Sequence, residues 1–360
     1  MKNWLNQTHV GDCRVLMRQM IADGVKVQTV VTSPPYWGLR DYGVSGQFGL
    51  ERDPLRYLAR MRSVFRLVWD LLADDGTLWL NMGDSYACAP GGWQGKNGQR
   101  ASRTFTARIA NHKRGSGLKP KDLVGMPWLL ALTLRNDGWY LRRDIIWHKP
   151  NPMPESVTDR PTTSHEYLFL LTKADRYYYD APAIKEPASP DTHARYARGR
   201  SDHHKYADGG PGNQTIAKSF EHMEKKFRPG VNPKAKVPSG WDTGDGSHRE
   251  AIGRYPRSKQ NESFSAAVAD IVDSRNKRSV WTIPTQAFSK AHFATFPEDL
   301  IAPCILAGAP AGGIVFDPFM GSGTTAKVAT DLGRQFIGTE INPAYVAMHE
   351  SRRTTTGMPL

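Results

Sequence analysis

Two prolines and two aromatic residues follow a β-branched run near the start of the chain. The stretch reads Val30-Val31-Thr32-Ser33-Pro34-Pro35-Tyr36-Trp37. Proline has no backbone donor and fixes φ at about −65°, so a strand ends here and the carbonyls of Pro34 and Pro35 are free to accept from a ligand. The rings of Tyr36 and Trp37 add flat faces. Such a site suits an extruded nucleobase with an exocyclic amine, and the alternative is a proline turn closed by core aromatics.

A strand, a glycine loop and a helix are predicted roughly 280 positions further on. This stretch reads Ile314-Val315-Phe316-Asp317-Pro318-Phe319-Met320-Gly321-Ser322-Gly323-Thr324-Thr325. Gly321 and Gly323 let a ligand approach the backbone, and a helix beginning near Thr324 offers unpaired N–H groups to a carboxylate or phosphate. The next apolar run ends at Glu340, where an acidic side chain would accept from ribose hydroxyls. One ligand with a carboxylate and a ribose fits both features.

Together these motifs resemble those of the DNA amino-methyltransferases that use S-adenosylmethionine. The base motif precedes the cofactor loop, which is the order found in the circularly permuted β group of cytosine-N4 and adenine-N6 enzymes. Gly11-Asp12 is similar to the family's segment whose Asp contacts the cofactor adenine. The segment His292–Pro297 is similar to the one that lines the cofactor pocket. The resemblance covers most of the chain outside about 181–275.

The resemblance implies an α/β fold with a Rossmann-like methyltransferase sheet, mostly parallel with an antiparallel closing strand, plus an irregular inserted region. Residues 1–180 would form the catalytic half, including a basic loop at 88–122. Residues 276–360 would form the cofactor-binding half. Residues 181–275 are polar and lack periodicity. They would form an inserted target-recognition region, and the alternative is a flexible insertion that touches only the DNA backbone.

The resemblance also assigns roles to single residues. The Ser33 hydroxyl and the Pro34 carbonyl would accept from the amine of the target base, and Tyr36 would stack on that base. The expected catalytic residues are Ser33, Pro34, Pro35, Tyr36 and Asp84. The residues expected to bind S-adenosylmethionine are Asp12, Thr32, Phe296, Pro297, Asp317, Phe319, Gly321, Ser322, Gly323, Thr324, Thr325, Glu340 and Asn342. Serine at position 33 is commoner among cytosine-N4 enzymes, which predicts N4-cytosine methylation, with adenine-N6 as the alternative.

A βαβ unit is predicted to position Ser33. The run Val27–Thr32 has the pattern of a buried strand, an apolar repeat over 55–72 predicts a helix, and Thr77–Asn81 predicts a second strand. Ligands of open α/β sheets bind at the carboxyl ends of the strands, so Asp84 is a candidate second acceptor near the target amine. A single Asp in such a loop is also a common cap.

Further along, residues 123–136 are predicted to form a helix, followed by strands within 139–149 and 164–172. In the resembling family such strands close the sheet and their loop lies near the flipped base. His165 and Glu166 have no second His at helical spacing, so no metal site is expected. A structural histidine or a contact to the base is the prediction for this pair.

Basic residues concentrate between Gln94 and Asp122, where Asp122 is the one acidic residue. Such a run can hold DNA phosphates, and the alternative is a solvated loop. The residues expected to contact DNA, three of them in the inserted region, are Arg100, Arg103, Arg108, Lys113, Arg114, Lys119, Arg195, Arg198 and Arg200.

The composition agrees with a polyanionic partner. The chain of 360 residues has 48 Lys and Arg against 35 Asp and Glu, a net charge of +13, which favours double-stranded DNA. Its three cysteines lie far apart, and no stretch reaches the roughly 18 apolar residues of a membrane span. These features predict a metal-free, cytoplasmic protein without a membrane partner. A cognate restriction endonuclease is a further expected partner, and the oligomeric state is not predicted.

Two other classes of protein stay open. Methyltransferases that act on RNA or on protein glutamine use a related motif, but usually with Asn in place of Ser33 and with the motif after the cofactor loop. A catalytically silent DNA-binding protein that keeps the fold is the second alternative. The intact residues Ser33, Tyr36, Gly321, Gly323 and Glu340 argue against it.

Overall fold

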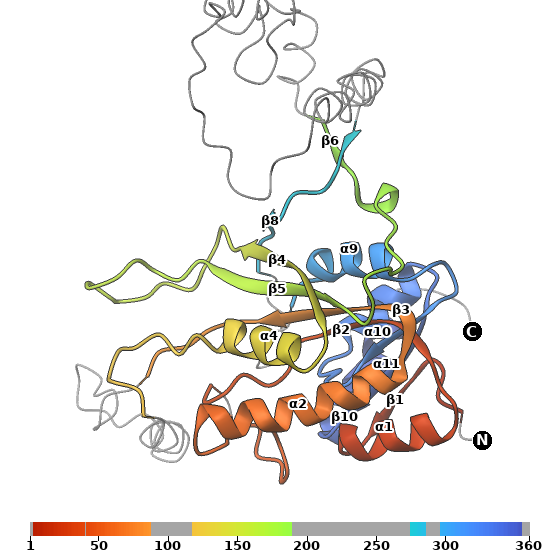
Figure 1. Cartoon of the computed structure of the whole chain (residues 1–360), viewed down its shortest axis with the longest axis horizontal. Coiled ribbons are helices and arrows are strands. Elements are labelled where there is room, and N and C mark those ends of the chain that lie inside the picture. Colours follow the sequence, from red (N-terminus) through yellow and green to blue (C-terminus); the bar gives the residue numbers. More distant parts are fainter. Residues whose placement is uncertain (1–2, 40, 88–116, 189–273, 286–295, 355–360) are drawn as a thin grey trace, which may run out of the picture. The chain divides into compact units, whose positions relative to one another are not determined.

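An eight-stranded sheet forms the centre of the computed structural model, which describes residues 3–39, 41–87, 117–188, 274–285 and 296–354 (Figure 1). In spatial order the strands are β1 (Gln7–Val10), β10 (Gln335–Glu340), β9 (Ile314–Asp317), β2 (Val27–Thr32), β3 (Leu72–Met82), β5 (His165–Thr172), β4 (Tyr140–His148) and β8 (Val280–Thr282). The helices are α1 (Cys13–Ala22), α2 (Pro54–Leu71), α4 (Met126–Asn136), α9 (Glu298–Gly308), α10 (Thr324–Asp331) and α11 (Pro343–Thr354), with a 3-10 turn η1 (Pro182–Ile184).

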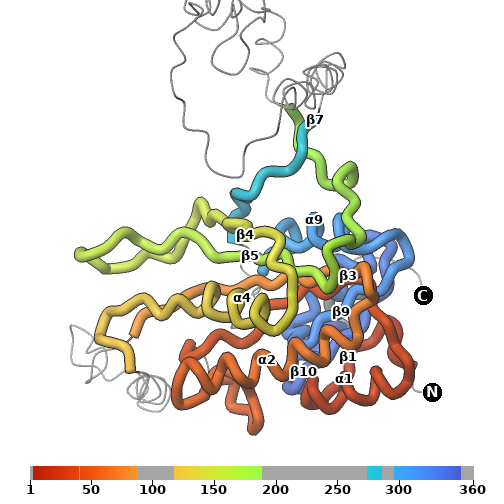
Figure 2. The backbone as a smooth tube through the Cα atoms, in the orientation of Figure 1, coloured from red at the N-terminus to blue at the C-terminus, as the bar shows by residue number. Residues whose placement is uncertain are grey.

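The sheet is mostly parallel. Strands β1, β10, β9, β2 and β3 pair in parallel, whereas β5 is antiparallel to both β3 and β4. Strand β2 pairs with β9, so segments nearly 300 residues apart lie side by side. Figure 2 shows the same for β1, in red, which lies close to β9 and β10, in blue. The predicted fold class, a Rossmann-like sheet with an antiparallel closing strand, is confirmed.

Both faces of the sheet are buried because side chains alternate along each strand. Val30 and Leu78 pack into the core beneath α1, α2 and α4, while their neighbours Val31 and Trp79 pack into the core beneath α9 and α10. Helix α2 presents a stripe that includes Tyr57, which is fully buried. Burial on both faces explains the near-continuous apolar run of β2.

Local sequence sets several element boundaries. Asp12 and Asp53 accept from backbone N–H groups at the starts of α1 and α2. Helix α4 begins at Met126, later than the start of the predicted range, because Pro127 is tolerated only in the first turn. Strand β3 begins earlier than predicted, and its pairing with β2 is interrupted: Leu72 pairs with Val27 and then Thr77 with Thr29.

The carboxyl ends of the parallel strands meet at one edge of the sheet. Because β5 runs the opposite way, its first residues lie at that same edge. His148 at the end of β4 pairs with His165 at the start of β5, so the next residues, Lys149 and Glu166, reach the edge where β2 ends. This register brings charged side chains beside Ser33.

The chain forms two compact units, residues 1–184 with 276–360, and residues 185–275. Within the second unit, β6 (Glu186–Pro187) pairs antiparallel with β7 (Ser274–Arg275). The predicted roles of the three segments as catalytic, recognition and cofactor-binding regions stay predictions. None of the helices in the described part of the chain has the length and apolar character that a membrane span requires.

Candidate functional site

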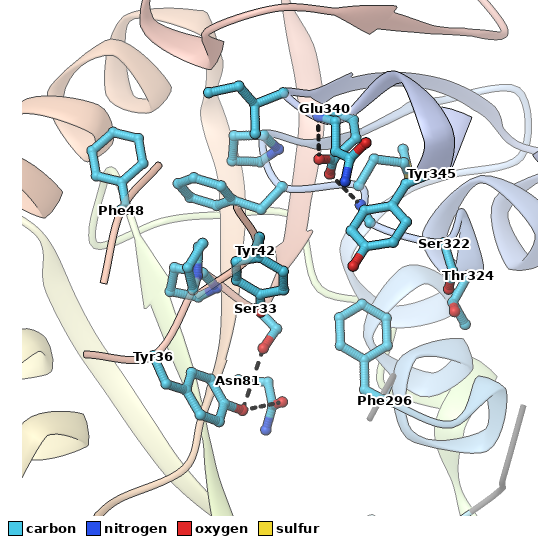
Figure 3. Close-up of a pocket in the computed structure, with 18 of the residues that line it drawn as sticks. Ser33, Tyr36, Tyr42, Phe48, Asn81, Phe296, Ser322, Thr324, Glu340 and Tyr345 are labelled. Atoms are coloured by element: carbon cyan, nitrogen blue, oxygen red, sulfur yellow. Dashed lines mark hydrogen bonds between the residues drawn. The ribbon is translucent and has the colours of Figure 1, made fainter. Parts of the chain in front are cut away.

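A cavity of about 280 Å³ opens at the carboxyl edge of the sheet (Figure 3). Residues at or just after the carboxyl ends of six strands, together with the beginning of β5, supply its walls. They include Gly11-Asp12 after β1, Ser33–Tyr36 after β2, Asn81 in β3, Lys149 after β4, Glu166 in β5, Pro318–Ser322 after β9 and Glu340–Asn342 at the end of β10. Figure 3 shows Ser33, Tyr36 and Asn81 toward one end of the cavity and Glu340, Ser322 and Thr324 toward the other.

The glycine loop leads into α10 with two residues in the left-handed region. Gly321 has φ +54° and Gly323, which directly precedes the helix, has φ +86°. A Cβ on Gly323 would lie 2.7 Å from Cδ2 of His349. His349 Nε2 lies 2.7 Å from the Gly321 carbonyl, so this nitrogen donates to the loop. Glycine is therefore required at position 323 by both backbone conformation and space.

Ser322 is the clearest mark of a polar ligand in the cavity. Its Oγ is buried and has no hydrogen-bond partner within the described part of the chain. The residue lines the cavity next to Thr324, at the first turn of α10, where backbone N–H groups are directed away from the helix. A buried hydroxyl without a partner is costly, so this end fits an anionic or polar ligand group such as a carboxylate.

Glu340 joins the end of β10 to the glycine loop. Its Oε2 accepts from the Gly321 N–H at 2.9 Å, and its Oε1 accepts from the Asn342 N–H at 2.8 Å. Burial raises the pKa of this carboxyl, and the backbone donors counteract part of that rise. A carboxylate oxygen accepts more than one hydrogen bond, so lone pairs remain for ligand hydroxyls.

Asp317 does not line the cavity but holds two of its walls together. Its carboxylate accepts from the Thr32 hydroxyl at 2.6 Å, the Thr325 hydroxyl at 2.7 Å and the Phe319 N–H at 2.9 Å. Burial raises the pKa of Asp317 to about 6 despite these donors. Thr32, Asp317 and Thr325 therefore tie the end of β2 to the start of α10 from outside the cavity lining.

Aromatic side chains line the cavity near Asp12. The Asp12 carboxylate caps α1 and pairs with Arg14 at 2.6 Å, and the Arg14 hydrogen bond lowers the pKa of Asp12. Phe48 meets Phe319 edge to face, with ring centroids 5.7 Å apart. The guanidinium of Arg60 lies 4.4 Å from the centroid of Phe48. Sequence reasoning missed Phe48, whose aromatic ring in a glycine-rich stretch was the available signal.

At the other end, a hydrogen-bonded chain of side chains includes the predicted base motif. The Ser33 hydroxyl lies 3.3 Å from that of Tyr36, which lies 2.8 Å from Glu166 Oε2 and 3.2 Å from Asn81 Oδ1. Burial, and then the charge of Glu166, raise the pKa of Tyr36 well above its usual value. Tyr36 is therefore a neutral hydrogen-bond donor. Lys149 forms a short ion pair with the other oxygen of Glu166.

The two prolines of the motif differ, which corrects the expectation that both carbonyls are free. The Pro35 carbonyl accepts from the hydroxyl of Tyr57 at 2.9 Å. The Pro34 carbonyl has no donor within the described residues. The buried helix α2 supplies Tyr57, so this contact fixes the loop. Of the two prolines, Pro34 is therefore the one whose carbonyl stays open in the described part of the chain.

Asp84 lies outside the lining of the cavity. Its carboxylate accepts from the N–H groups of Gly125 at 3.0 Å, Met126 at 3.2 Å and Ser85 at 2.8 Å. These contacts stabilise the start of α4. The oxygen atoms that stand beside Tyr36 belong instead to Asn81 and Glu166. The structure thus places Asp84 as a loop and helix cap, the role that the sequence left as the alternative.

The remaining predicted residues divide between lining and support. Phe296, Phe319 and Asn342 line the cavity, whereas Pro297 precedes α9 outside the lining. Lys119 is exposed and lies 3.7 Å from Asp122. The other predicted DNA contacts, at 100, 103, 108, 113, 114, 195, 198 and 200, lie outside the described residues.

Sequence reasoning noted Glu166 but missed Lys149 and Asn81 as parts of this site. The sequence predicts a structural role or a base contact for His165 and Glu166, and the structure places Glu166 in the cavity lining. Asn81 was predicted only as the last residue of a strand. Lys149 and Glu166 are brought to the site by the antiparallel register of β4 and β5, and the sequence alone does not reveal that register.

The fold and the cavity define a cofactor-binding α/β enzyme, and comparison with known proteins gives its family. A DNA methylase family model of the N6/N4 class matches residues 27–351. The chain is 39% identical to the Type II methyltransferase M.SmaI of Serratia marcescens, with 95% of this chain and 89% of that protein covered. It is 37% identical to M.Cfr9I of Citrobacter freundii, with 95% and 85% covered. The chain belongs to this DNA methylase family.

Solved structures agree on the fold. The PvuII DNA methyltransferase, described as cytosine-N4-specific, matches with a TM-score of 0.54 at 15% identity, with 98% of this chain and 89% of that chain covered. A Thermus thermophilus protein crystallised with S-adenosyl-L-methionine matches with a TM-score of 0.50 at 20% identity, with 98% and 95% covered. The chain is a site-specific DNA methyltransferase, and its cofactor is S-adenosylmethionine, as family membership requires.

Proposed function

We propose that this enzyme methylates the exocyclic N4 amine of a cytosine that is flipped out of duplex DNA, with adenine-N6 as the alternative target. One observation carries the proposal: a single cavity has the Ser33 and Pro34 acceptors toward one end and the glycine loop with Ser322 toward the other. A base and a methyl donor could therefore meet within it. This geometry supports direct in-line transfer, in which the bond from nitrogen to the methyl group would form as the bond from sulfur to that methyl group breaks, leaving the thioether S-adenosylhomocysteine. The methylated amine would then release one proton.

The base end supplies hydrogen-bond acceptors. An exocyclic amine is a weak nucleophile because its lone pair is delocalised into the ring. Ser33 Oγ and the Pro34 carbonyl would accept its two hydrogens and favour localisation of that lone pair. The Tyr36 ring would pack on the base and fix its plane. Asp84 is left out of this acceptor set because it lies outside the cavity lining, and Pro35 is left out because its carbonyl holds the hydroxyl of Tyr57.

The cofactor end fits S-adenosylmethionine residue by residue. Ser322 Oγ and the first turn of α10 would hold its carboxylate, Glu340 its ribose, and Phe48 with Phe319 its adenine. Asp12, which lines the same part of the cavity, would contact the adenine edge. When bound, this cofactor supplies an electrophilic methyl group on a sulfonium. The glycine loop would keep it in place through Glu340 and His349.

The choice of cytosine rests on Ser33. A neutral hydroxyl at this position is typical of cytosine-N4 members of the resembling group, where adenine-N6 members more often have Asp. The relatives named above are Type II methyltransferases, which supports a role in restriction–modification with a cognate endonuclease. The basic segment at 88–122 and the inserted region would bind the duplex and select its sequence.

The test is transfer of a labelled methyl group from S-adenosylmethionine to unmethylated genomic DNA by the purified chain, followed by mass spectrometry of the nucleosides. We expect N4-methylcytosine. N6-methyladenine without N4-methylcytosine would assign the alternative target. Transfer to RNA or protein with none to DNA would contradict the proposal, as would intact DNA binding without any transfer.

A further inference from the structure

The hydrogen bonds among Ser33, Tyr36, Asn81 and Glu166 at the base end can run in only one direction, because Asn81 and Glu166 both act as acceptors toward Tyr36. Glu166 lies 2.8 Å from the Tyr36 hydroxyl, and a carboxylate oxygen can only accept. Asn81 is fixed as a second acceptor, because its Nδ2 donates to the Tyr167 carbonyl at 3.1 Å and so turns its Oδ1 toward Tyr36. The one hydrogen of the Tyr36 hydroxyl therefore points to these acceptors, away from Ser33.

The orientation of the Tyr36 hydroxyl also fixes the orientation of the Ser33 hydroxyl. Since the Tyr36 oxygen uses its hydrogen elsewhere, it can only accept from the Ser33 hydroxyl, which lies 3.3 Å away. The hydrogen of Ser33 then points at Tyr36. The lone pairs of Ser33 Oγ are left to face the cavity that this residue lines. A ligand group at that place must donate.

Charge and packing hold Glu166 in this position. Its second oxygen pairs with Lys149, and both side chains are only 18% exposed. The Lys149 ammonium lies 4.3 Å from the centroid of the Trp147 ring, which limits its movement. Gly83 makes room, because a Cβ there would lie 2.9 Å from Cε2 of Tyr36 and 3.1 Å from Cδ of Glu166. The ammonium donates to one oxygen of Glu166, and the other accepts from Tyr36.

We propose that Glu166, held by Lys149, is a positioning residue that makes Ser33 Oγ a hydrogen-bond acceptor and thereby selects an amino over a keto group on the flipped base. The inference rests on the function proposed above. An exocyclic amine donates to Ser33, whereas the carbonyl of uracil or thymine at the same place meets only lone pairs. Discrimination then arises from an unpaired, desolvated acceptor in the wrong complex.

The decisive variant is Glu166→Gln in a protein that also carries Asn81→Ala, which removes the second acceptor of the Tyr36 hydrogen. The Asn81→Ala protein is the reference for this variant and for the Lys149 variant described below. Lys149 dictates how the new amide at position 166 turns. The ammonium attracts the amide oxygen and repels the amide NH₂, so Nε2 faces Tyr36 and donates to it. The Tyr36 hydrogen is then free to point at Ser33, which turns the Ser33 hydrogen into the cavity. We expect a single-turnover methylation rate about 100-fold lower than that of the reference, with cofactor affinity unchanged.

A second-site rescue separates hydrogen-bond direction from general damage. In Glu166→Gln combined with Lys149→Met, the amide can turn its oxygen back to Tyr36 and restore the original direction. We expect the double variant to methylate about tenfold faster than Glu166→Gln alone, although it has lost one more native side chain. Glu298→Gln, which removes a carboxylate paired with Lys327 outside the cavity, is the control and should match the wild type.

A binding measurement gives a second readout that does not need turnover. Duplexes in which uracil replaces the methylated cytosine place a carbonyl where the amine was. We expect the Asn81→Ala reference to prefer the cytosine duplex and Glu166→Gln to lose most of that preference. Cofactor-induced thermal shifts of each variant report whether it is folded.

The outcomes distinguish this inference from the function on which it rests. If the wild type methylates cytosine but Glu166→Gln is as fast as its Asn81→Ala reference, or the double variant is slower than the single one, the inference is overturned and the proposed function stands. If Glu166→Gln weakens cofactor binding as much as it slows transfer, the loss is not one of hydrogen-bond direction, and the inference again fails. If the wild type transfers no methyl group to an exocyclic amine, both fail.

Discussion

The two ends of the cavity are built in different ways. The cofactor end is organised around the glycine loop, in which the N–H of Gly321 donates to Glu340 and the absence of a side chain at Gly323 makes room for His349. The base end is assembled from polar side chains on separate strands and loops, namely Ser33, Tyr36, Asn81, Lys149 and Glu166. A local loop thus serves one end, whereas the register of β3, β4 and β5 serves the other.

The largest expected effect separates the two ends functionally. Replacing Tyr36 with Ala removes the ring that would fix the base and leaves Glu166 without its buried partner. We expect the methylation rate to fall about 1000-fold while the affinity for S-adenosylmethionine changes little. Isothermal titration with the cofactor and single-turnover kinetics measure the two quantities. Tyr140→Ala, on an exposed part of β4, is the control, and loss of cofactor binding in Tyr36→Ala would show that the base end is misplaced.

Asp317 links the two ends, and its effect appears in the pH dependence of stability. Its pKa of about 6 in the folded state is above the ordinary value of 3.8, so folding favours the protonated form. This contribution to the unfolding free energy is fully present below about pH 4 and is lost as pH rises through about 6, by on the order of 3 kcal/mol. In Asp317→Asn this loss should disappear.

Urea unfolding at pH 4 to 7 tests the prediction for Asp317. As pH rises across that window, the unfolding free energy of the wild type should fall relative to that of Asp317→Asn. Asp299→Asn, an exposed position in the first turn of α9, corrects for the loss of one carboxylate. If the unfolding free energies of wild type and Asp317→Asn depended on pH in the same way, the raised pKa of Asp317 would be contradicted.

A smaller effect is expected from Gly323→Ala at the cofactor end. The new Cβ would strain a left-handed backbone and press on His349, which supports the loop. We expect the cofactor dissociation constant to rise about thirtyfold. Gly333→Ala is a matched control, since its φ of +70° imposes similar strain with no atom within 4 Å of the new Cβ. Equal loss of affinity in both variants would remove the argument for a close approach at Gly323.

The smallest effect concerns the hydroxyl of Ser322. Because Ser322 Oγ has no partner within the described part of the chain, Ser322→Ala should leave the melting temperature of the free protein unchanged or slightly higher. The cofactor dissociation constant should rise about tenfold if this hydroxyl donates to the cofactor carboxylate. Ser63→Ala, on the exposed side of α2, is the control. Unchanged cofactor affinity in Ser322→Ala would assign the carboxylate elsewhere.

The same contrast explains what the sequence could predict. Strand β2 matches its predicted bounds, Val27–Thr32, and the glycine loop leads into a helix beginning at Thr324 as predicted. Both are local patterns: a β-branched run before prolines, and glycines before a helix. Ser322 and Glu340 are among the predicted cofactor residues that line the cavity, and their roles stay proposals.

Contacts that depend on tertiary register could not be predicted in this way. Lys149 and Glu166 reach the cavity only because β5 runs antiparallel to β4 with His148 opposite His165. The Pro35 carbonyl is not open to a ligand as predicted, because helix α2 places the hydroxyl of Tyr57 within hydrogen-bond distance of it. Asp84 follows β3 as predicted, yet its oxygens turn to the start of α4. No local pattern encodes these three contacts.

A crystal structure of the protein with S-adenosylhomocysteine and a duplex that contains the methylated site would test the two-ended cavity most directly. We expect one flipped base in the cavity, with its exocyclic amine within hydrogen-bond distance of Ser33 Oγ and the Pro34 carbonyl. We also expect the cofactor carboxylate at Ser322 Oγ. A base held outside the cavity, or a cofactor whose carboxylate lies beside Tyr36, would contradict the division of the cavity into these two ends.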